Sequence, residues 1–445
     1  MEELHEISAS TALDLIKSGR VGSLELVEAC ISRIECTDDS INAWEHIDFD
    51  QARQQAEEMD RIRRSGLPTG SLHGLPVGLK DIVDAKGLPT ECGSEIFKGQ
   101  MPKSDAALTE HLREEGAVVL GKTVSTECAF MNPSRTRNPR NLSRTPGGSS
   151  SGSAASVASC QVPLAIGTQT NGSVIRPAAF CGTFGFKPTR GVISRRGVLR
   201  TSKSLDQVGV FGRALEDVAL LADAISGYDS NDEASYTRPK PQMLQGARRQ
   251  VPIEPLFAWF ELPFGDRLSD DSREGFEELL EALGDRVERV SSPKGFLDMM
   301  DAHRIVFQWE LCEHMAHEAE THWELMGEAL HEAFESGWKL SNSQYEKAME
   351  VMAGSGRYFD AFFKDYDGII SPCAPGEAPM FDEGTGDPAF CTLWTFAGLP
   401  CVAMPILKGA NDLPVGVQLI GERERDDNLL CTANWLLRKL SEEAE

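Results

Sequence analysis

Two serines and one lysine lie in sequence settings that suit cleavage of an amide bond. Ser173 ends the run GTQTNGS, in which Gly172 permits a tight turn that could aim consecutive backbone N–H groups at one point. Ser149 lies in GGSSSG, and Lys80 lies in the apolar run LPVGLKDIVD. Because an amide carbonyl is a poor electrophile, a serine that attacks it needs a base and needs donors for the oxyanion. These residues supply a candidate nucleophile, proton relay and base.

The expected base is a lysine, because none of the nine histidines lies near these serines in the sequence or suggests a triad. Burial disfavours an ammonium group and can lower the pKa of a lysine by about 3–5 units. Lys80 would then be a neutral amine at physiological pH. The predicted oxyanion hole consists of the backbone N–H groups of Thr170, Asn171, Gly172 and Ser173.

Several motifs occur in the order found in the amidase signature family, which the chain resembles from about residue 10 to about residue 440. They are GLKD around Lys80, TPGGSSSGSAA at 145–155, GTQTNGSVIRPAAFCG at 167–182, FKPTRG at 186–191, SLDQVG at 204–209 and LPVGVQLIG at 413–421. The resemblance implies a Ser–cisSer–Lys triad in which Lys80 is the base, Ser149 the relay and Ser173 the nucleophile that forms an acyl-enzyme. It also implies a cis peptide bond before Ser149.

Three residues depart from the commonest sequence of that family. Ser151 stands where glycine is frequent, and Gln169 and Asn171 replace an aspartate and a glycine. None of the three is a proposed proton carrier, so we expect the triad to survive. Asn171 lies beside the oxyanion hole and could alter the room left for the acyl group.

Two further segments match the residue pattern of a catalytic motif but not the secondary structure that the motif requires. Residues 116–123 fit the phosphate-loop pattern GxxxxGK[ST], but the intervening AVVL is typical of an apolar strand. GSSSG at 148–152 fits the GxSxG elbow, which would make Ser150 the nucleophile, but no strand is predicted before it. We therefore expect neither a nucleotide site nor an elbow serine.

No metal site or cofactor is expected. Cys312, His314, His317 and His322 cluster on a predicted helix, but His322 falls on another face and the zinc pattern HExxH is absent. A solvated acidic helix face accounts for them better. Asp81 and Arg176 are expected to be structural ion partners.

The elements that must position these residues alternate between helix and strand. Apolar spacing predicts helices within the first 65 residues, with Ser23 as a cap, and another over 105–115. Residues 75–84 and 117–120 are short apolar runs typical of buried strands. The alternation indicates an α/β fold with a parallel or mixed layered sheet. The family resemblance implies a large mixed β-sheet with helices on both faces.

We expect one domain over residues 1–445. Its predicted parts are N-terminal helices (1–65), a signature core (66–227), a variable helical region (228–366) and a return to the sheet (367–445). In 146–191 small residues alternate with apolar ones, which indicates core and not a linker. Later helices are predicted over 270–284, 299–336, 342–365 and 426–440, and later strands over 368–371, 400–404 and 415–420.

Charge and cysteine content indicate which partners and which cellular compartment to expect. A net charge of −25 disfavours nucleic acid and anionic lipid surfaces as partners. The eleven cysteines include no CxxC pair, which indicates reduced thiols and a cytoplasmic protein. The first eight residues do not have the layout of a signal peptide, and no run approaches the roughly 18 apolar residues of a membrane span.

The sequence thus predicts an amidohydrolase that cleaves a C–N bond of a small or aryl amide. Alternatives are the amidase subunit of a tRNA-dependent amidotransferase, a hydrolase of carbamates, urea-type compounds or esters, and an inactive scaffold. The family resemblance also implies a homodimer as a possible assembly. By position in the family, the substrate would contact the segment 129–132, with Phe130, Met131 and Asn132, and parts of 300–395, with Phe390 and Trp394.

Overall fold

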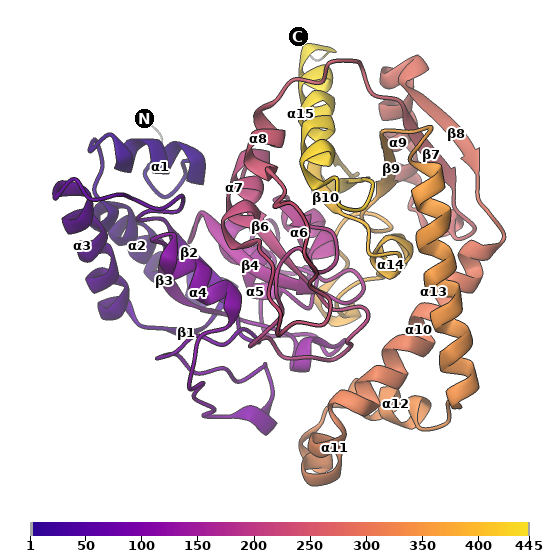
Figure 1. Cartoon of the computed structure of the whole chain (residues 1–445), viewed down its shortest axis with the longest axis horizontal. Coiled ribbons are helices and arrows are strands. Elements are labelled where there is room, and N and C mark those ends of the chain that lie inside the picture. Colours follow the sequence, from indigo (N-terminus) through magenta and orange to yellow (C-terminus); the bar gives the residue numbers. More distant parts are fainter. Residues whose placement is uncertain (1–2, 444–445) are drawn as a thin grey trace.

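The computed structural model describes residues 3–443, and these residues form one mixed sheet of eleven strands (Figure 1). The strand order is β1-β3-β2-β4-β6-β5-β10-β11-β9-β7-β8. β2 pairs in parallel with β3 and β4, and β7 pairs in parallel with β8 and β9, whereas the other pairs are antiparallel. The strands are β1 (Trp44–Ile47), β2 (Pro76–Lys80), β3 (Val118–Thr123), β4 (Leu164–Gln169), β5 (Phe184–Lys187), β6 (Gln207–Gly212), β7 (Phe257–Glu261), β8 (Val287–Ser291), β9 (Gly368–Pro372), β10 (Cys401–Lys408) and β11 (Pro414–Ile420).

Different helices cover the two faces of this sheet, so the predicted α/β fold with a large mixed sheet is confirmed. On β6, a side chain at Gly209 would meet Val174 at the start of α6, and one at Gly212 would meet Val218 of α7. Positions three apart on a strand face opposite sides, which places α6 and α7 on opposite faces. The helices before residue 250 are α1 (Ala9–Lys17), α2 (Ser23–Ile41), α3 (Phe49–Arg64), α4 (Ala107–Glu114), α5 (Ser151–Ala158), α6 (Ile175–Cys181), α7 (Leu215–Ile225) and α8 (Met243–Arg248).

Residues 228–366 contain more than the predicted helices. They also contribute β7 and β8, which form the far edge of the sheet. Both strands were missed. The VERVS sequence of β8 is partly exposed and lacks the apolar run of a buried strand, whereas the apolar FAWFE sequence of β7 was present but not assigned. The helices of this region and beyond are α9 (Asp270–Leu283), α10 (Gly295–His314), α11 (Ala316–His322), α12 (Glu328–Gly337), α13 (Asn342–Phe362), α14 (Ala389–Phe396) and α15 (Asp426–Glu443).

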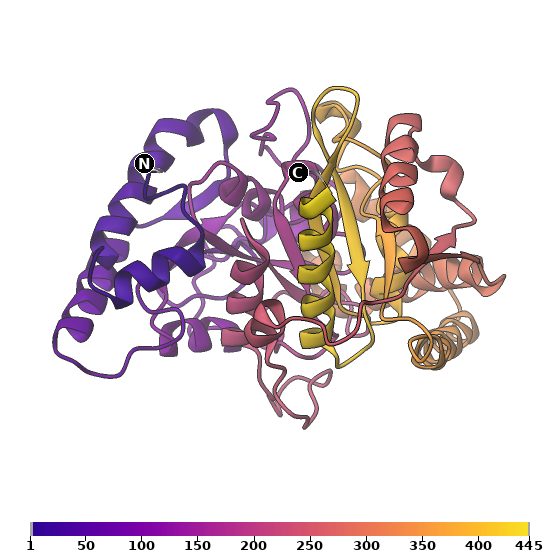
Figure 2. The same ribbon diagram turned by 90° about the horizontal axis from the view of Figure 1, so that it is seen from above.

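The helix predicted over 299–336 is in fact three helices. The backbone leaves helical geometry at Met315, which separates α10 from α11, and again before Gly327, which precedes α12. α10 and α13 run side by side at the end of the molecule opposite to α1, α2 and α3 (Figures 1 and 2). The outer end of this helical region projects away from the sheet, while α10 also packs against α14.

The predicted cap of α2 was wrong by one residue. Gly22 takes the cap position, and Ser23 is the first helical residue. The carboxylate of Asp60 on α3 accepts hydrogen bonds from the N–H groups of Ser23 and Leu24, at 2.9 and 3.2 Å. A tertiary contact therefore satisfies the free N–H groups that a cap residue would otherwise bind.

The small residues of 146–191 lie in the core, as predicted. α5 is buried along nearly all of its length, and a side chain at Gly152 would lie 2.2 Å from the carbonyl oxygen of Ala43. Only glycine allows this approach of two backbones.

The eleven cysteines are free thiols. Among residues 3–443, no helix is both long enough and apolar enough to cross a membrane. The division of the chain into a single domain with four parts stays a prediction.

Candidate active site

Lys80 ends strand β2 with its side chain fully removed from solvent. Its Nζ lies 2.7 Å from Ser149 Oγ and 2.8 Å from Thr168 Oγ1. Because β2 and β4 are parallel neighbours, with Leu79 opposite Ile166, the carboxyl ends of both strands bring Lys80 and Thr168 together. No carboxylate forms an ion pair with this amine among the described residues.

Burial lowers the pKa of Lys80 from its ordinary value of 10.5 to about 7, although the negative charge of Asp206 opposes the shift. Removing an ammonium from water favours the neutral amine when no opposite charge compensates. The neutral amine is therefore accessible near pH 7, where it contacts the hydroxyl of Ser149. A base of this pKa operates efficiently at physiological pH.

Ser149 lies in the turn that leads into α5 and is almost completely buried. The Gly148–Ser149 peptide bond is cis, in agreement with the family resemblance. A side chain at Gly148 would lie 2.9 Å from the methyl group of Thr385. The Gly148 carbonyl accepts a hydrogen bond of 2.8 Å from the guanidinium of Arg176. Packing and this hydrogen bond together fix the backbone that carries the Ser149 hydroxyl.

Ser173 lies in the short connection between β4 and α6 and is 9% exposed. Gln169, at the end of β4, accepts hydrogen bonds through its side chain from the N–H groups of Val174 and Ile175, at 2.8 and 3.0 Å. The residue that replaces the family's aspartate thus anchors the start of α6. Within the described chain, Ser173 Oγ and Ser149 Oγ are not hydrogen-bonded to each other.

The backbone of the predicted oxyanion hole is held by side chains from two distant helices. His303 of α10 lies with its Nε2 3.0 Å from the carbonyl oxygen of Thr170. Thr395 of α14 donates its hydroxyl to the carbonyl oxygen of Asn171, at 2.5 Å. The side chain of Asn171 lies 2.7 Å from Thr392 Oγ1, so it is tied to α14 as well. Over residues 3–443, the N–H groups of residues 170–173 have no hydrogen-bond acceptor in the protein.

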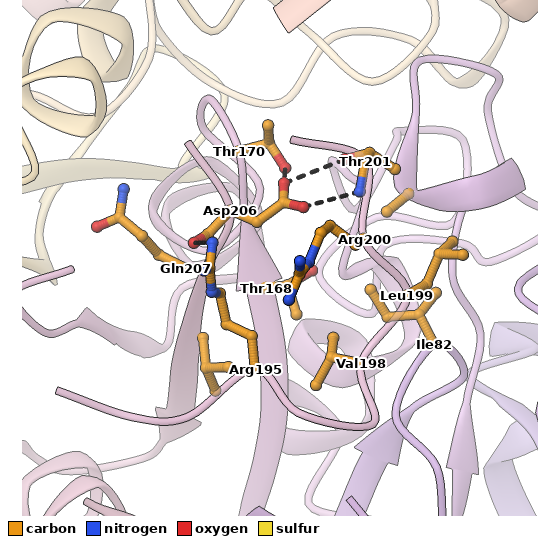
Figure 3. Close-up of a pocket in the computed structure, with 12 residues that line it drawn as sticks. Ile82, Thr168, Thr170, Arg195, Val198, Leu199, Arg200, Thr201, Asp206 and Gln207 are labelled. Carbon is orange, nitrogen blue, oxygen red and sulfur yellow. Dashed lines mark hydrogen bonds between the residues drawn. The ribbon is translucent and has the colours of Figure 1, made fainter. Parts of the chain in front are cut away.

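A small pocket lies next to these groups (Figure 3). Asp206 stands in its wall and accepts hydrogen bonds from the Thr170 hydroxyl, at 2.6 Å, and from the N–H groups of Thr201 and Ser202, both at 2.8 Å. This carboxylate is also the charge that most strongly opposes the lowered pKa of Lys80. The pocket walls include Ile82, Ala129, Thr168, Thr170, Leu199 and Asp206.

The predicted substrate segment 129–132 lies partly at this pocket. Ala129 lines it, and the ring of Phe130 packs on Phe307 of α10 with the ring centroids 5.3 Å apart. Met131 is 41% exposed. Asn132 instead binds Glu127, at 2.5 Å, which ties the segment to the start of α12.

Phe390 and Trp394 of α14, the other predicted substrate contacts, are almost completely buried. Phe390 packs on Phe264, and Trp394 packs on Phe296 and Phe359. Both rings therefore lie among other aromatic side chains in the protein interior. Their contact with substrate stays a prediction.

The two rejected motifs have structural roles. Lys122 of the phosphate-loop match is fully buried in β3, where its amine lies 2.9 Å from a carboxylate oxygen of Asp81. The hydroxyl of Ser150 is buried and lies 3.2 Å from both the N–H and the carbonyl oxygen of Thr168. Asp81 is thus the structural ion partner that was predicted. Ser151 donates its hydroxyl to the Gly147 carbonyl at 2.8 Å.

The prediction for Arg176 was wrong. Its guanidinium binds the Gly148 carbonyl and the Thr385 hydroxyl, and no ion pair forms with it among the described residues. Because of burial the pKa of Arg176 falls to about 10. The predicted histidine cluster is divided between α10, which ends at His314, and α11, which carries His317 and His322.

Sequence reasoning missed four residues of this site, which are Thr168, Asp206, His303 and Thr395. Thr168 and Asp206 lie inside quoted motifs, so the signal was present but not assigned. His303 and Thr395 lie more than 130 residues after the loop that they contact. No local pattern in the sequence marks a contact of that kind.

Comparisons with known proteins identify the family of this chain and chains of similar fold. A family model described as Amidase matches residues 25–430. The chain is 34% identical to the A subunit of the glutamyl-tRNA(Gln) amidotransferase of Synechococcus elongatus, over 94% of this chain and 96% of the relative. A solved chain from a vestigial protein complex that reveals the evolutionary origins of an s-triazine catabolic enzyme superposes with a TM-score of 0.92, at 28% identity and 98% coverage of both chains. The peptide amidase of Stenotrophomonas maltophilia superposes with a TM-score of 0.83, at 26% identity, over 98% of this chain and 97% of that one.

Proposed function

The chain belongs to the amidase signature family, and from this premise we propose that it hydrolyses a small or aryl amide through an acyl-enzyme on Ser173. Family membership makes it an enzyme of amide C–N bonds, and the roles of individual residues belong to the proposal. The observation that carries it is the contact of 2.7 Å between the buried amine of Lys80 and the hydroxyl of Ser149. A desolvated amine with a pKa of about 7 is a suitable general base.

In the first half-reaction, Ser173 Oγ forms a bond to the carbonyl carbon of the amide. Its proton moves to Ser149 Oγ as the Ser149 proton moves to Lys80 Nζ. The oxyanion receives hydrogen bonds from the N–H groups of residues 170–173, whose freedom from protein acceptors supports this role. When the C–N bond breaks, Ser149 gives its proton to the leaving amine and regains one from Lys80.

In the second half-reaction, water attacks the acyl carbon and passes a proton through Ser149 to Lys80. The bond between the acyl carbon and Ser173 Oγ then breaks, Ser173 recovers its proton, and the acid leaves. Thr168 keeps the Lys80 amine in place throughout, because it bonds the amine at 2.8 Å without taking part in the proton path. The same steps apply to carbamates, urea-type compounds and esters.

A second candidate is the amidase component of an amidotransferase, with glutamine as the amide. The observation that favours it is the 34% identity, over 94% of the chain, to the A subunit of the glutamyl-tRNA(Gln) amidotransferase. That relative is named as one subunit of an enzyme. The solved chain with a TM-score of 0.92 likewise comes from a protein complex. A partner protein is therefore a proposal of equal standing with the homodimer. Ammonia release from glutamine, enhanced by added partner proteins, is the expected result for this candidate.

A serine-directed fluorophosphonate tests the proposed chemistry without knowledge of the substrate. We expect one adduct per chain, on Ser173 by mass spectrometry, and none in Ser173→Ala. Wild-type protein would then be offered anilides, aliphatic amides, carbamates, ureas and glutamine. Normal amide turnover by Ser173→Ala would overturn the proposal, and absence of any adduct on the wild type would favour an inactive scaffold.

A further inference from the structure

Two carbonyl groups of the loop before Ser173 are each bound by a side chain from outside the family motifs. The Thr170 carbonyl accepts from His303 Nε2 at 3.0 Å, and the Asn171 carbonyl accepts from Thr395 Oγ1 at 2.5 Å. His303 lies on α10 and Thr395 on α14, two helices that pack against each other. Both donors are buried, with 3% and 0% of their surfaces exposed.

Because a peptide group is planar, a hydrogen bond to its C=O also fixes the direction of its N–H. In a trans peptide the C=O of one residue and the N–H of the next point in opposite directions. The only cis bond among the described residues precedes Ser149, so the peptide bonds of this loop are trans. A donor that holds the Thr170 carbonyl therefore directs the N–H of Asn171 the opposite way. A donor on the Asn171 carbonyl does the same for the N–H of Gly172.

We propose that His303 and Thr395 are positioning residues of the oxyanion hole, which aim the N–H groups of Asn171 and Gly172 at the oxyanion by holding the carbonyl groups of Thr170 and Asn171. The inference rests on the proposed acyl-enzyme chemistry and names two residues that this chemistry does not use directly. A hydrogen bond to a carbonyl also polarises its peptide group, which strengthens the N–H as a donor.

The surroundings of each donor suit this role. The His303 ring packs edge-on against Phe307 and Phe396, with centroid distances of 6.1 and 6.3 Å. Burial lowers the pKa of His303 to about 4, so the ring stays neutral and its Nε2 carries the proton that the carbonyl accepts. Thr395 Oγ1 also accepts from the Gln169 side chain at 2.9 Å, which leaves its proton for the Asn171 carbonyl.

Thr395→Val removes this hydroxyl with little change in shape, and Thr395→Ser keeps it. We expect the first-order rate of fluorophosphonate attachment to Ser173 at saturating probe to fall roughly tenfold or more in Thr395→Val, because a misdirected oxyanion donor loses part of the 10²–10³-fold effect of a whole donor. The half-saturating probe concentration should stay within about twofold, and Thr395→Ser should recover most of the rate. Thr392→Val is the matched control, because the Thr392 hydroxyl bonds the Asn171 side chain and the Pro388 carbonyl but, among residues 3–443, neither of the two loop carbonyls that the proposal names.

His303→Leu and His303→Gln form the second pair. The amide nitrogen of glutamine replaces the Nε2 donor, so His303→Gln should label several times faster than His303→Leu. Val306→Ala, at a fully buried position of α10, controls for loosened packing. Equal labelling rates within each pair, or a loss in Val306→Ala as large as in His303→Leu, would overturn the inference. If His303→Leu does not fold, the Thr395 pair and His303→Gln still decide it. A wild type that takes no adduct would instead count against the proposed function.

Discussion

Lys80 and Lys122 lie on neighbouring strands, both with no exposed surface, yet their surroundings differ in one respect. Lys122 Nζ contacts a carboxylate oxygen of Asp81 at 2.9 Å, together with the Pro89 carbonyl and the Thr90 hydroxyl. Among residues 3–443, Lys80 Nζ forms hydrogen bonds only with two hydroxyls, at 2.7 and 2.8 Å. An ion pair offsets the cost of burying an ammonium, whereas two hydroxyls do not.

The difference shows how equal burial can serve structure in one place and chemistry in another. At Lys122 the compensating charge makes the cation part of the fold. At Lys80 the missing compensation brings the pKa down to about 7, and the amine lies against a serine. Burial creates the possibility of a neutral base, and the partners decide whether it is realised.

The largest expected effect is the loss of activity in Lys80→Met. The unbranched side chain fills the same space but accepts no proton, so turnover of an anilide that the wild type cleaves should fall roughly a thousandfold or more. Steady-state kinetics measure this. Lys122→Met, assayed while folded, should keep most of the turnover. Similar losses of turnover in the two variants would break the distinction.

Lys122→Met, which should keep most of the turnover, should instead lose stability. Lys122→Met leaves the Asp81 carboxylate buried without its partner, which should cost about 3–5 kcal/mol of unfolding free energy. Urea denaturation followed by circular dichroism gives the value. Asp81→Asn added to Lys122→Met should recover part of the loss, because asparagine keeps an acceptor for the Glu91 N–H. A double variant as unstable as the sum of both single variants would contradict the explanation.

The pH dependence of acylation should follow the Lys80 amine. Because only the neutral amine accepts a proton, the rate should be low below pH 6, rise through a midpoint of about 7 and then level off. Stopped-flow measurement of acyl-enzyme formation reports the midpoint. A rate independent of pH between about 5 and 9 would exclude this lysine as the base.

The smallest effect is expected from Asp206→Asn. The negative charge of Asp206 favours the ammonium form of Lys80, so its removal should move the midpoint to lower pH. The expected shift is less than about one pH unit, because burial is the larger cause of the low pKa. An upward shift of the midpoint would mean that losing the hydrogen bonds to Thr170 and Thr201 changes the Lys80 pKa more than losing the negative charge does.

Much of this site could be predicted from the sequence, because its parts lie in local patterns. The apolar flanks of Lys80 indicated a buried strand, and the glycine before Ser173 indicated the turn. The strand predicted over 117–120 ended too early, because β3 continues through Lys122 to Thr123. The pairing of Lys122 with Asp81 follows from the parallel register of β2 and β3, which periodicity alone does not reveal.

Other parts could not be predicted, for identifiable physical reasons. His303 lies in a polar, helical stretch where its contact with Thr170 depends on how α10 packs against α14. The partly exposed edge strand β8 carries too few apolar residues to indicate a strand. Phe390 and Trp394 were chosen for position; both rings are buried, and their contact with substrate stays a prediction.

The course of α10 has a consequence for how enzymes of this shape diversify. One end of this helix lies beside α12, and its middle carries both Phe307, against Phe130, and His303, against Thr170. Recombination that exchanged this helix between homologues would replace, in one event, the packing partner of the predicted substrate segment 129–132 and a side chain that holds the loop before Ser173. Selectivity and turnover would then be inherited as a linked pair of traits, and directed evolution of one would have to monitor the other.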